Sequence, residues 1–185
     1  GGGNMGAAIV GGLFKKYRVM VCEKDPARVR LLKRKFKVTV ADLEPVAREC
    51  SVIILAVKPQ QYLDACRGIA DLVHDDHLIV SIMAGVSTRS LEAQFPQCRA
   101  RVVRAMPNLP IHVGAGMAGI CKGQHAQEVD LLRAQRIFEA GGRCIVIQDE
   151  SEMDAVTAVS GSGPAYFYYF VEALIAAGER AGLTR

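Results

Sequence analysis

The first six residues carry glycines at the spacing Gly-x-Gly-x-x-Gly, a pattern that suits phosphate binding. Gly1, Gly3 and Gly6 fill the three glycine positions. In such a loop the first glycine permits a tight turn, the second lets a phosphate approach the backbone, and the third allows a helix to pack closely on a sheet. A pyrophosphate would lie at the N-terminus of the helix that starts at Asn4, where free N–H groups and the helix dipole favour an anion. Because the motif alone is weak evidence for a nucleotide site, the residues around it must decide whether the loop binds a phosphate.

An acidic residue follows this loop at the distance expected for a dinucleotide site. The pattern after the loop predicts a helix and then a short apolar strand at 18–22, directly followed by Glu23. A carboxylate there can accept hydrogen bonds from ribose hydroxyls. Glu23 would repel a 2′-phosphate and favours NAD, whereas Lys24 and Arg28 would attract one and favour NADP. The sequence thus predicts a site for NADPH or NADH; a glycine-rich turn that binds nothing is the alternative.

Predicted strands and helices alternate before residue 150. The apolar runs at 51–57 and 77–82 are typical of strands covered on both faces. The alternation predicts a doubly wound α/β domain with a mainly parallel sheet. From Glu152 onward the pattern is helical only.

Both ends of the chain, and one internal join, look incomplete. No strand precedes the glycine loop, although a strand normally holds such a loop. The helix predicted at 4–16 meets the strand at 18–22 without a Gly, Pro or Asn turn signal. We therefore expect a fragment, or residues omitted at the ends and near Lys16.

Three later loops follow strands and should border the same crevice as the glycine loop. They span residues 56–60, 82–85 and 106–108. Lys58 could bind a phosphate or carboxylate, or be a solvated loop lysine. Asn108 could donate a hydrogen bond to nicotinamide or substrate, or stabilise the turn after Pro107.

A second glycine-rich turn, Ser160-Gly161-Ser162-Gly163-Pro164, begins a helix. Pro164 suits the first helical turn, so the helix would offer free N–H groups beside two hydroxyls. Such a place suits a carboxylate or a small polar ring, and a plain helix start is the alternative. The next residues, 165–171, are apolar around the whole helix and predict burial against another chain or further sequence.

Composition excludes several classes of protein. With 50% hydrophobic residues and a net charge of +4, the chain is not disordered, and the charge does not indicate a nucleic-acid partner. The longest apolar run, 165–178, contains Glu172 and is too short to span a bilayer. Six cysteines without a Cys-x-x-Cys pair, and no secretory leader, predict a cytoplasmic protein. The histidines and aspartates at 74–77 are expected to form a solvated loop, not a metal site.

Four motifs, taken together, resemble pyrroline-5-carboxylate reductase. They are Gly-x-Gly-Asn-Met-Gly at 1–6, Ala-Val-Lys-Pro-Gln at 56–60, Arg-x-Met-Pro-Asn at 104–108 and Asp-Ala-Val-Thr-Ala-Val-Ser-Gly-Ser-Gly-Pro-Ala-Tyr at 154–166. The resemblance covers the chain in order, and the last motif is highly specific. It implies NAD(P)H-dependent reduction of 1-pyrroline-5-carboxylate to L-proline, the last step of proline synthesis. It also implies a dinucleotide domain at 1–150 that lacks its first strand, and the start of a helical domain at 151–185 that forms a homodimer or larger homo-oligomer.

The same resemblance assigns site residues but leaves the site incomplete. By motif match, the cofactor contacts would be Gly1, Gly2, Gly3, Asn4, Met5, Gly6, Glu23, Lys24, Ala56, Val57, Lys58, Pro59, Ile82, Met83 and Ala84. The substrate would lie near Ser160, Gly161, Ser162 and Gly163, with Asn108 as a further candidate. The rest of the helical domain, including a loop that contacts the substrate, is absent, and no residue is an obvious proton donor.

Two other functions remain as alternatives. A β-hydroxyacid dehydrogenase also joins a dinucleotide domain to a helical one, but would carry an acid–base lysine after its glycine-rich turn. Here Lys122 is the last lysine, which disfavours that reading. A non-catalytic NAD(P)-binding module would need neither Ser160 nor Ser162.

Overall fold

The computed structural model describes all 185 residues and centres on a five-stranded sheet. Its strands lie in the order β3-β4-β5-β6-β7, and only the β5–β6 pair is antiparallel. The predicted mainly parallel sheet is therefore confirmed. The strands are β3 (Val52–Leu55), β4 (Leu78–Ser81), β5 (Arg101–Pro107), β6 (Gly116–Lys122) and β7 (Gly142–Val146).

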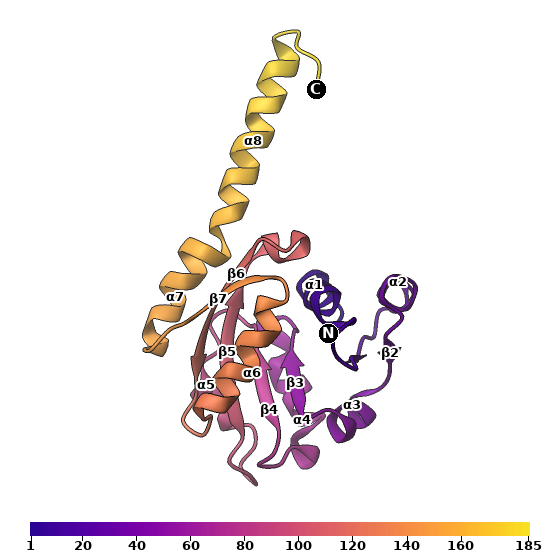
Figure 1. The fold of residues 1–185 in the computed structure, drawn as a ribbon, viewed down its shortest axis with the longest axis vertical. Helices are drawn as coiled ribbons and strands as arrows, with labels where there is room; N and C mark the ends of the chain where they lie inside the picture. The colour runs from indigo at the N-terminus through magenta and orange to yellow at the C-terminus, as the bar shows by residue number, and fades with distance from the viewer.

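Helices cover both faces of this sheet, which confirms the doubly wound architecture (Figure 1). One face packs against α1 (Asn4–Leu13) and α6 (Glu128–Glu139). Because side chains alternate along a strand, Leu78 and Val80 point to that face, whereas Ile79 points to the other. The second face packs against α3 (Leu43–Glu49), α4 (Tyr62–Arg67) and α5 (Thr88–Glu92).

Several predicted helices are shorter than expected, for local reasons. The helix expected at 4–16 ends at Leu13, because the N–H groups of Lys16 and Tyr17 both donate to the Leu13 carbonyl and close a turn there. This turn explains how the helix can be followed by a strand without a glycine or proline between them. The sequence also predicts a helix at 60–72, whereas the structure has α4 flanked by two 3₁₀ turns, η1 (Pro59–Gln61) and η2 (Ala70–Leu72). A further 3₁₀ turn, η3 (Leu109–Val113), follows β5.

A short second sheet lies beside the first and is separated from it by a cavity. Strands β1 (Met20–Val21) and β2 (Thr39–Val40) pair in parallel and flank α2 (Pro26–Phe36). A mostly apolar cavity of about 550 Å³ is lined by β1, β3 and α1. Strands β1 and β3, which line the cavity, each pair with a neighbouring strand on one side only. The cavity therefore has the strand edges and the apolar lining that an additional strand needs. The strand expected before the glycine loop stays a prediction.

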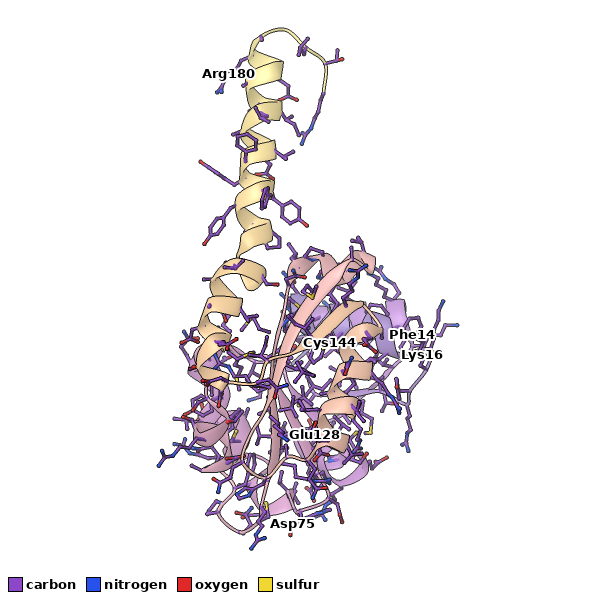
Figure 2. All side chains as sticks on the ribbon, turned by 60° about the vertical axis from the view of Figure 1, so that its left-hand side comes forward. Phe14, Lys16, Asp75, Glu128, Cys144 and Arg180 are labelled. Atoms are coloured by element: carbon purple, nitrogen blue, oxygen red, sulfur yellow. The ribbon has the colours of Figure 1, made fainter.

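The C-terminal segment is helical up to Arg180, as predicted. A 3₁₀ turn η4 (Glu150–Glu152) leads through α7 (Met153–Val156) and a π-helix η5 (Thr157–Gly161) into α8 (Gly163–Arg180). Figure 1 shows α8 projecting away from the sheet, and in Figure 2 its side chains stand clear of the rest of the chain up to Arg180. Tyr166, Phe167 and Tyr169 are 67–77% exposed. None of the helices has the length and apolar character needed to cross a membrane.

Candidate active site

The glycine loop is held so tightly that two of its positions exclude any side chain. A Cβ atom on Gly1 would overlap the Ala56 carbonyl, and one on Gly6 would overlap the Gly1 carbonyl. At Gly3, by contrast, nothing lies within 4 Å of where a Cβ atom would be. The loop is therefore packed against β3 on one side and open at its second motif glycine, where a phosphate would approach.

Helix α1 begins directly on this loop with its first turn uncapped. Gly3 is the N-cap, no side chain caps the helix, and the first turn holds no acidic residue. The first N–H groups of a helix have no intrahelical acceptor. The first turn, with Asn4, Met5 and Gly6, thus offers donors and a positive dipole end to an anion. These features fit the diphosphate of a dinucleotide.

Glu23 lies at the carboxyl end of β1, but its carboxylate faces the glycine loop. Oε2 accepts a hydrogen bond from the Gly2 N–H at 2.6 Å, and Oε1 accepts from the N–H groups of Lys24 and Asp25 at 2.8 and 2.9 Å. Partial burial by itself would raise the Glu23 pKa, but these three donors outweigh it and the pKa is lowered. Glu23 therefore holds the loop in place, a role that its type and spacing alone did not predict.

Replacing Glu23 with glutamine should reduce stability at neutral pH. Because the pKa of Glu23 is lowered by folding, its contribution is present above the unfolded value of 4.5 and is lost as the pH falls through the folded pKa. Urea unfolding of Glu23→Gln at pH 7 should show a loss of about 1 kcal/mol, and this loss should shrink below pH 4.5. Glu44→Gln, on an exposed helix pair with Arg48, is the matched control and should change little. A loss that stays constant with pH would contradict this account.

Two cations lie close to the loop. Lys24 is exposed, and Arg28 Nη1 donates to Asn4 Oδ1 at 3.3 Å, which keeps the guanidinium beside the start of α1. A 2′-phosphate would find both cations near Glu23.

The other predicted cofactor loops follow β3 and β4 at the same edge of the sheet. Ala56 contacts the glycine loop, and Lys58 is exposed at the end of β3 before the 3₁₀ turn that begins at Pro59. The side chains of Val57 and Ile82 are partly buried against the core, and the Val57 side chain also lies beside Gly1. Met83 is 1% exposed and supports the loop from beneath, whereas Ala84 is exposed.

The second glycine-rich turn opens into a separate cavity of about 370 Å³. Ser160, Gly163 and Asn108, all expected near the substrate, line it together. Gly161 and Ser162 do not: Gly161 packs on Met106, and the Ser162 N–H donates to the Thr157 carbonyl at 2.8 Å. Pro164 of the same turn also lines it, together with three residues that were not predicted from the sequence, Val159, Phe167 and Tyr168.

Helical spacing explains the missed residues. Phe167 and Tyr168 stand four positions after Gly163 and Pro164, so each pair lies on one side of α8. The expectation of free N–H groups at this helix start is only partly met. Ser162 and Ala165 use their N–H groups within the turn, and Pro164 has none.

Asn108 has a defined structural role. Its Oδ1 accepts from the Met117 N–H at 2.9 Å, and its Nδ2 donates to the Ser160 carbonyl at 3.2 Å. The residue is only 7% exposed. Asn108 therefore ties the end of β5 to the second glycine-rich turn, while part of its surface still lines the cavity.

Both ring nitrogens of His77 take part in hydrogen bonds within the fold. Its Nδ1 accepts from the His74 N–H, and its Nε2 lies 2.9 Å from the Ala47 carbonyl, to which it donates as the neutral tautomer. Burial lowers the pKa of His77, in keeping with a neutral ring. Both ring nitrogens are used, so His77 has no lone pair for a metal ion.

Comparison with known proteins gives the class and then the family. Residues 1–85 match the family described as NADP oxidoreductase, coenzyme F420-dependent, and residues 150–185 match pyrroline-5-carboxylate reductase dimerisation. Together with the glycine loop on a doubly wound sheet, these matches define an NAD(P)-dependent oxidoreductase.

The whole chain is similar to one kind of enzyme. It is 41% identical over 193 residues to pyrroline-5-carboxylate reductase of Synechocystis and 38% identical over 191 residues to that of Pseudomonas aeruginosa. The alignments cover 100% of this chain and 70% and 69% of those relatives. The chain belongs to the pyrroline-5-carboxylate reductase family. Other curated relatives are covered over 65% of their length, so the chain spans about two thirds of a typical member.

Solved structures agree with this assignment. The reductase of Coxiella burnetii is 34% identical, with a TM-score of 0.87, and this chain covers 70% of it. The Plasmodium falciparum enzyme, whose structure has NADP bound, is 30% identical, again with a TM-score of 0.87, and is covered over 69%. In both comparisons the whole of this chain is matched.

Proposed function

We propose that the protein reduces 1-pyrroline-5-carboxylate to L-proline with NADPH or NADH, as the final step of proline synthesis. The observation that carries this proposal is the family relationship over the whole chain, from the glycine loop to α8. The cavity lined by Asn108, Ser160 and Gly163 supports it, because its volume of about 370 Å³ lies in the range of small-molecule sites.

The residues divide into two groups by role. The free amides at the start of α1, from Gly3 to Gly6, would hold the diphosphate, and the loops at 56–59 and 82–84 would border the rest of the cofactor. When bound, the dihydronicotinamide supplies the hydride that reduces C5 of the imine. Ser160, Gly163 and Asn108 orient the ring, so that much of the rate enhancement arises from positioning.

Helix α8 supports a homodimer. The dimerisation match covers residues 150–185, and α8 carries aromatic side chains that no part of this chain covers. Burial of such a face is strongly favourable, at about 25 cal/mol per Å² of apolar surface. We place the dinucleotide domain at 1–150 and the start of the dimerisation domain at 151–185. A cytoplasmic location stays a prediction from the sequence.

The experiment that tests the function measures NADPH and NADH oxidation by the full-length enzyme in the presence of 1-pyrroline-5-carboxylate. We expect imine-dependent oxidation with stoichiometric formation of proline. Preferential oxidation of a 2-hydroxy or 3-hydroxy acid with NADP⁺ or NAD⁺ would instead favour a hydroxyacid dehydrogenase. Cofactor binding without turnover of any of these compounds would favour a non-catalytic binding module.

A further inference from the structure

One face of β5 contacts the segment that carries the second glycine-rich turn. Arg104 and Met106 are alternate residues of β5 and share a face, and Asn108 directly follows the last residue of the strand. Arg104 forms ion pairs with this segment, Met106 packs on Gly161, and Asn108 donates to the Ser160 carbonyl. Two side chains of β5 and that of the residue after it therefore contact η4, α7 and η5.

Arg104 is the charged member of this row and is almost fully buried. Its Nη1 lies 3.3 Å from Glu150 Oε1 and its Nη2 lies 3.0 Å from Asp154 Oδ1, while its side chain is 5% exposed. Glu150 is held from a second side, because its two oxygens accept from the N–H and the hydroxyl of Thr88 at 2.8 and 2.6 Å. The guanidinium is thus directed at two acids that flank the start of α7.

The two acids differ in their surroundings. The Glu150 side chain is 25% exposed and belongs to a network that joins β5, α5 and η4. The Asp154 side chain is 81% exposed, and its ion pair with Arg104 contributes little to stability at a surface. The ion pair between Arg104 and Asp154 instead fixes α7, the helix that directly precedes the π-helix containing Ser160.

We propose that Arg104, acting through Asp154, is a positioning residue that holds the second glycine-rich turn in the position that binds the cyclic imine. The inference rests on the proposed function. Arg104 does not line the substrate cavity and need not touch the substrate. Its effect should therefore appear in the affinity for the imine and not in cofactor binding, because the ion pairs of Arg104 are with Glu150 and Asp154 and not with the glycine loop or Glu23.

The decisive variant is Asp154→Asn in the full-length enzyme, because it removes one charge from an exposed side chain. We expect KM for the imine to rise about three- to tenfold, with the Kd for NADPH within about twofold of wild type. Asp154→Glu, which keeps the charge, should recover most of the loss. Asp64→Asn is the matched control, since Asp64 is 82% exposed and also pairs with an arginine, Arg67.

A second readout does not depend on turnover. Hydrogen exchange of the amides at 157–162 should be faster in Asp154→Asn than in wild type and in Asp64→Asn. If the wild-type enzyme does not reduce the imine, the proposed function fails while this exchange result still reports on positioning. Unchanged exchange in Asp154→Asn, or an equal rise in KM and NADPH Kd, would overturn the role assigned to Arg104.

Discussion

A Gly6→Ala variant should bind NADPH at least about tenfold more weakly than the wild-type protein. The added methyl group would overlap the Gly1 carbonyl, which is backbone and cannot rotate away. The loop must then shift, and its amides leave the positions from which they meet the diphosphate. Helix α1 itself should persist, because Ile9 and Leu13 anchor it in the core. Fluorescence titration with NADPH measures the effect.

Two further glycines provide the comparison. Gly3→Ala should also weaken NADPH binding, yet leave the melting temperature nearly unchanged, since the new methyl group meets nothing in the free protein. Gly11→Ala, in the same helix but away from the loop, places its Cβ 3.4 Å from Phe36 and should bind NADPH like wild type. Wild-type affinity in both Gly6→Ala and Gly3→Ala would show that the loop does not carry the diphosphate.

Charge placed on the exposed face of α8 should break the dimer of the full-length enzyme. Tyr169 and Phe170 are 77% and 61% exposed in this chain, and burying an aromatic side chain contributes about 1.5–3 kcal/mol. In a two-fold symmetric interface each substitution is present twice, once in each subunit. Tyr169→Glu combined with Phe170→Glu should therefore weaken dimerisation by at least about a thousandfold. Analytical ultracentrifugation measures the dissociation constant.

The control for this variant carries the same charge on the other domain. Leu132 lies on α6 and is 53% exposed, so Leu132→Glu should leave the dimer intact. If the α8 variant remains a dimer at micromolar concentration, the aromatic face is not the interface and the assignment of the dimerisation surface is wrong.

The parts of the fold that the sequence predicted well are those governed by local patterns. The buried runs that became β3 and β4 are apolar throughout, and both faces of these strands are indeed covered. Boundaries were less accurate where a backbone turn without glycine or proline ends a helix, as after Leu13. The two-residue strand β1 was predicted as longer, at 18–22, since the apolar pattern does not reveal where pairing stops.

The site shows the same division between local and distant determinants. The glycine loop could be predicted because glycine is the residue that allows another backbone or a ligand to approach the chain closely. The direction of the Glu23 carboxylate could not, since its partners depend on how the loop folds back. Arg104 was missed as a positioning residue because Glu150 and Asp154 are 46 and 50 residues away, and no spacing rule joins them.

A single hydrogen atom can be followed from the cofactor to the product. The full-length enzyme would convert 1-pyrroline-5-carboxylate in the presence of NADPH carrying deuterium at the transferable C4 position, and the product would be examined by NMR. We predict L-proline with one deuterium at C5. Proline without deuterium at C5, or no proline at all, would contradict the assignment of this chain to hydride transfer onto the imine.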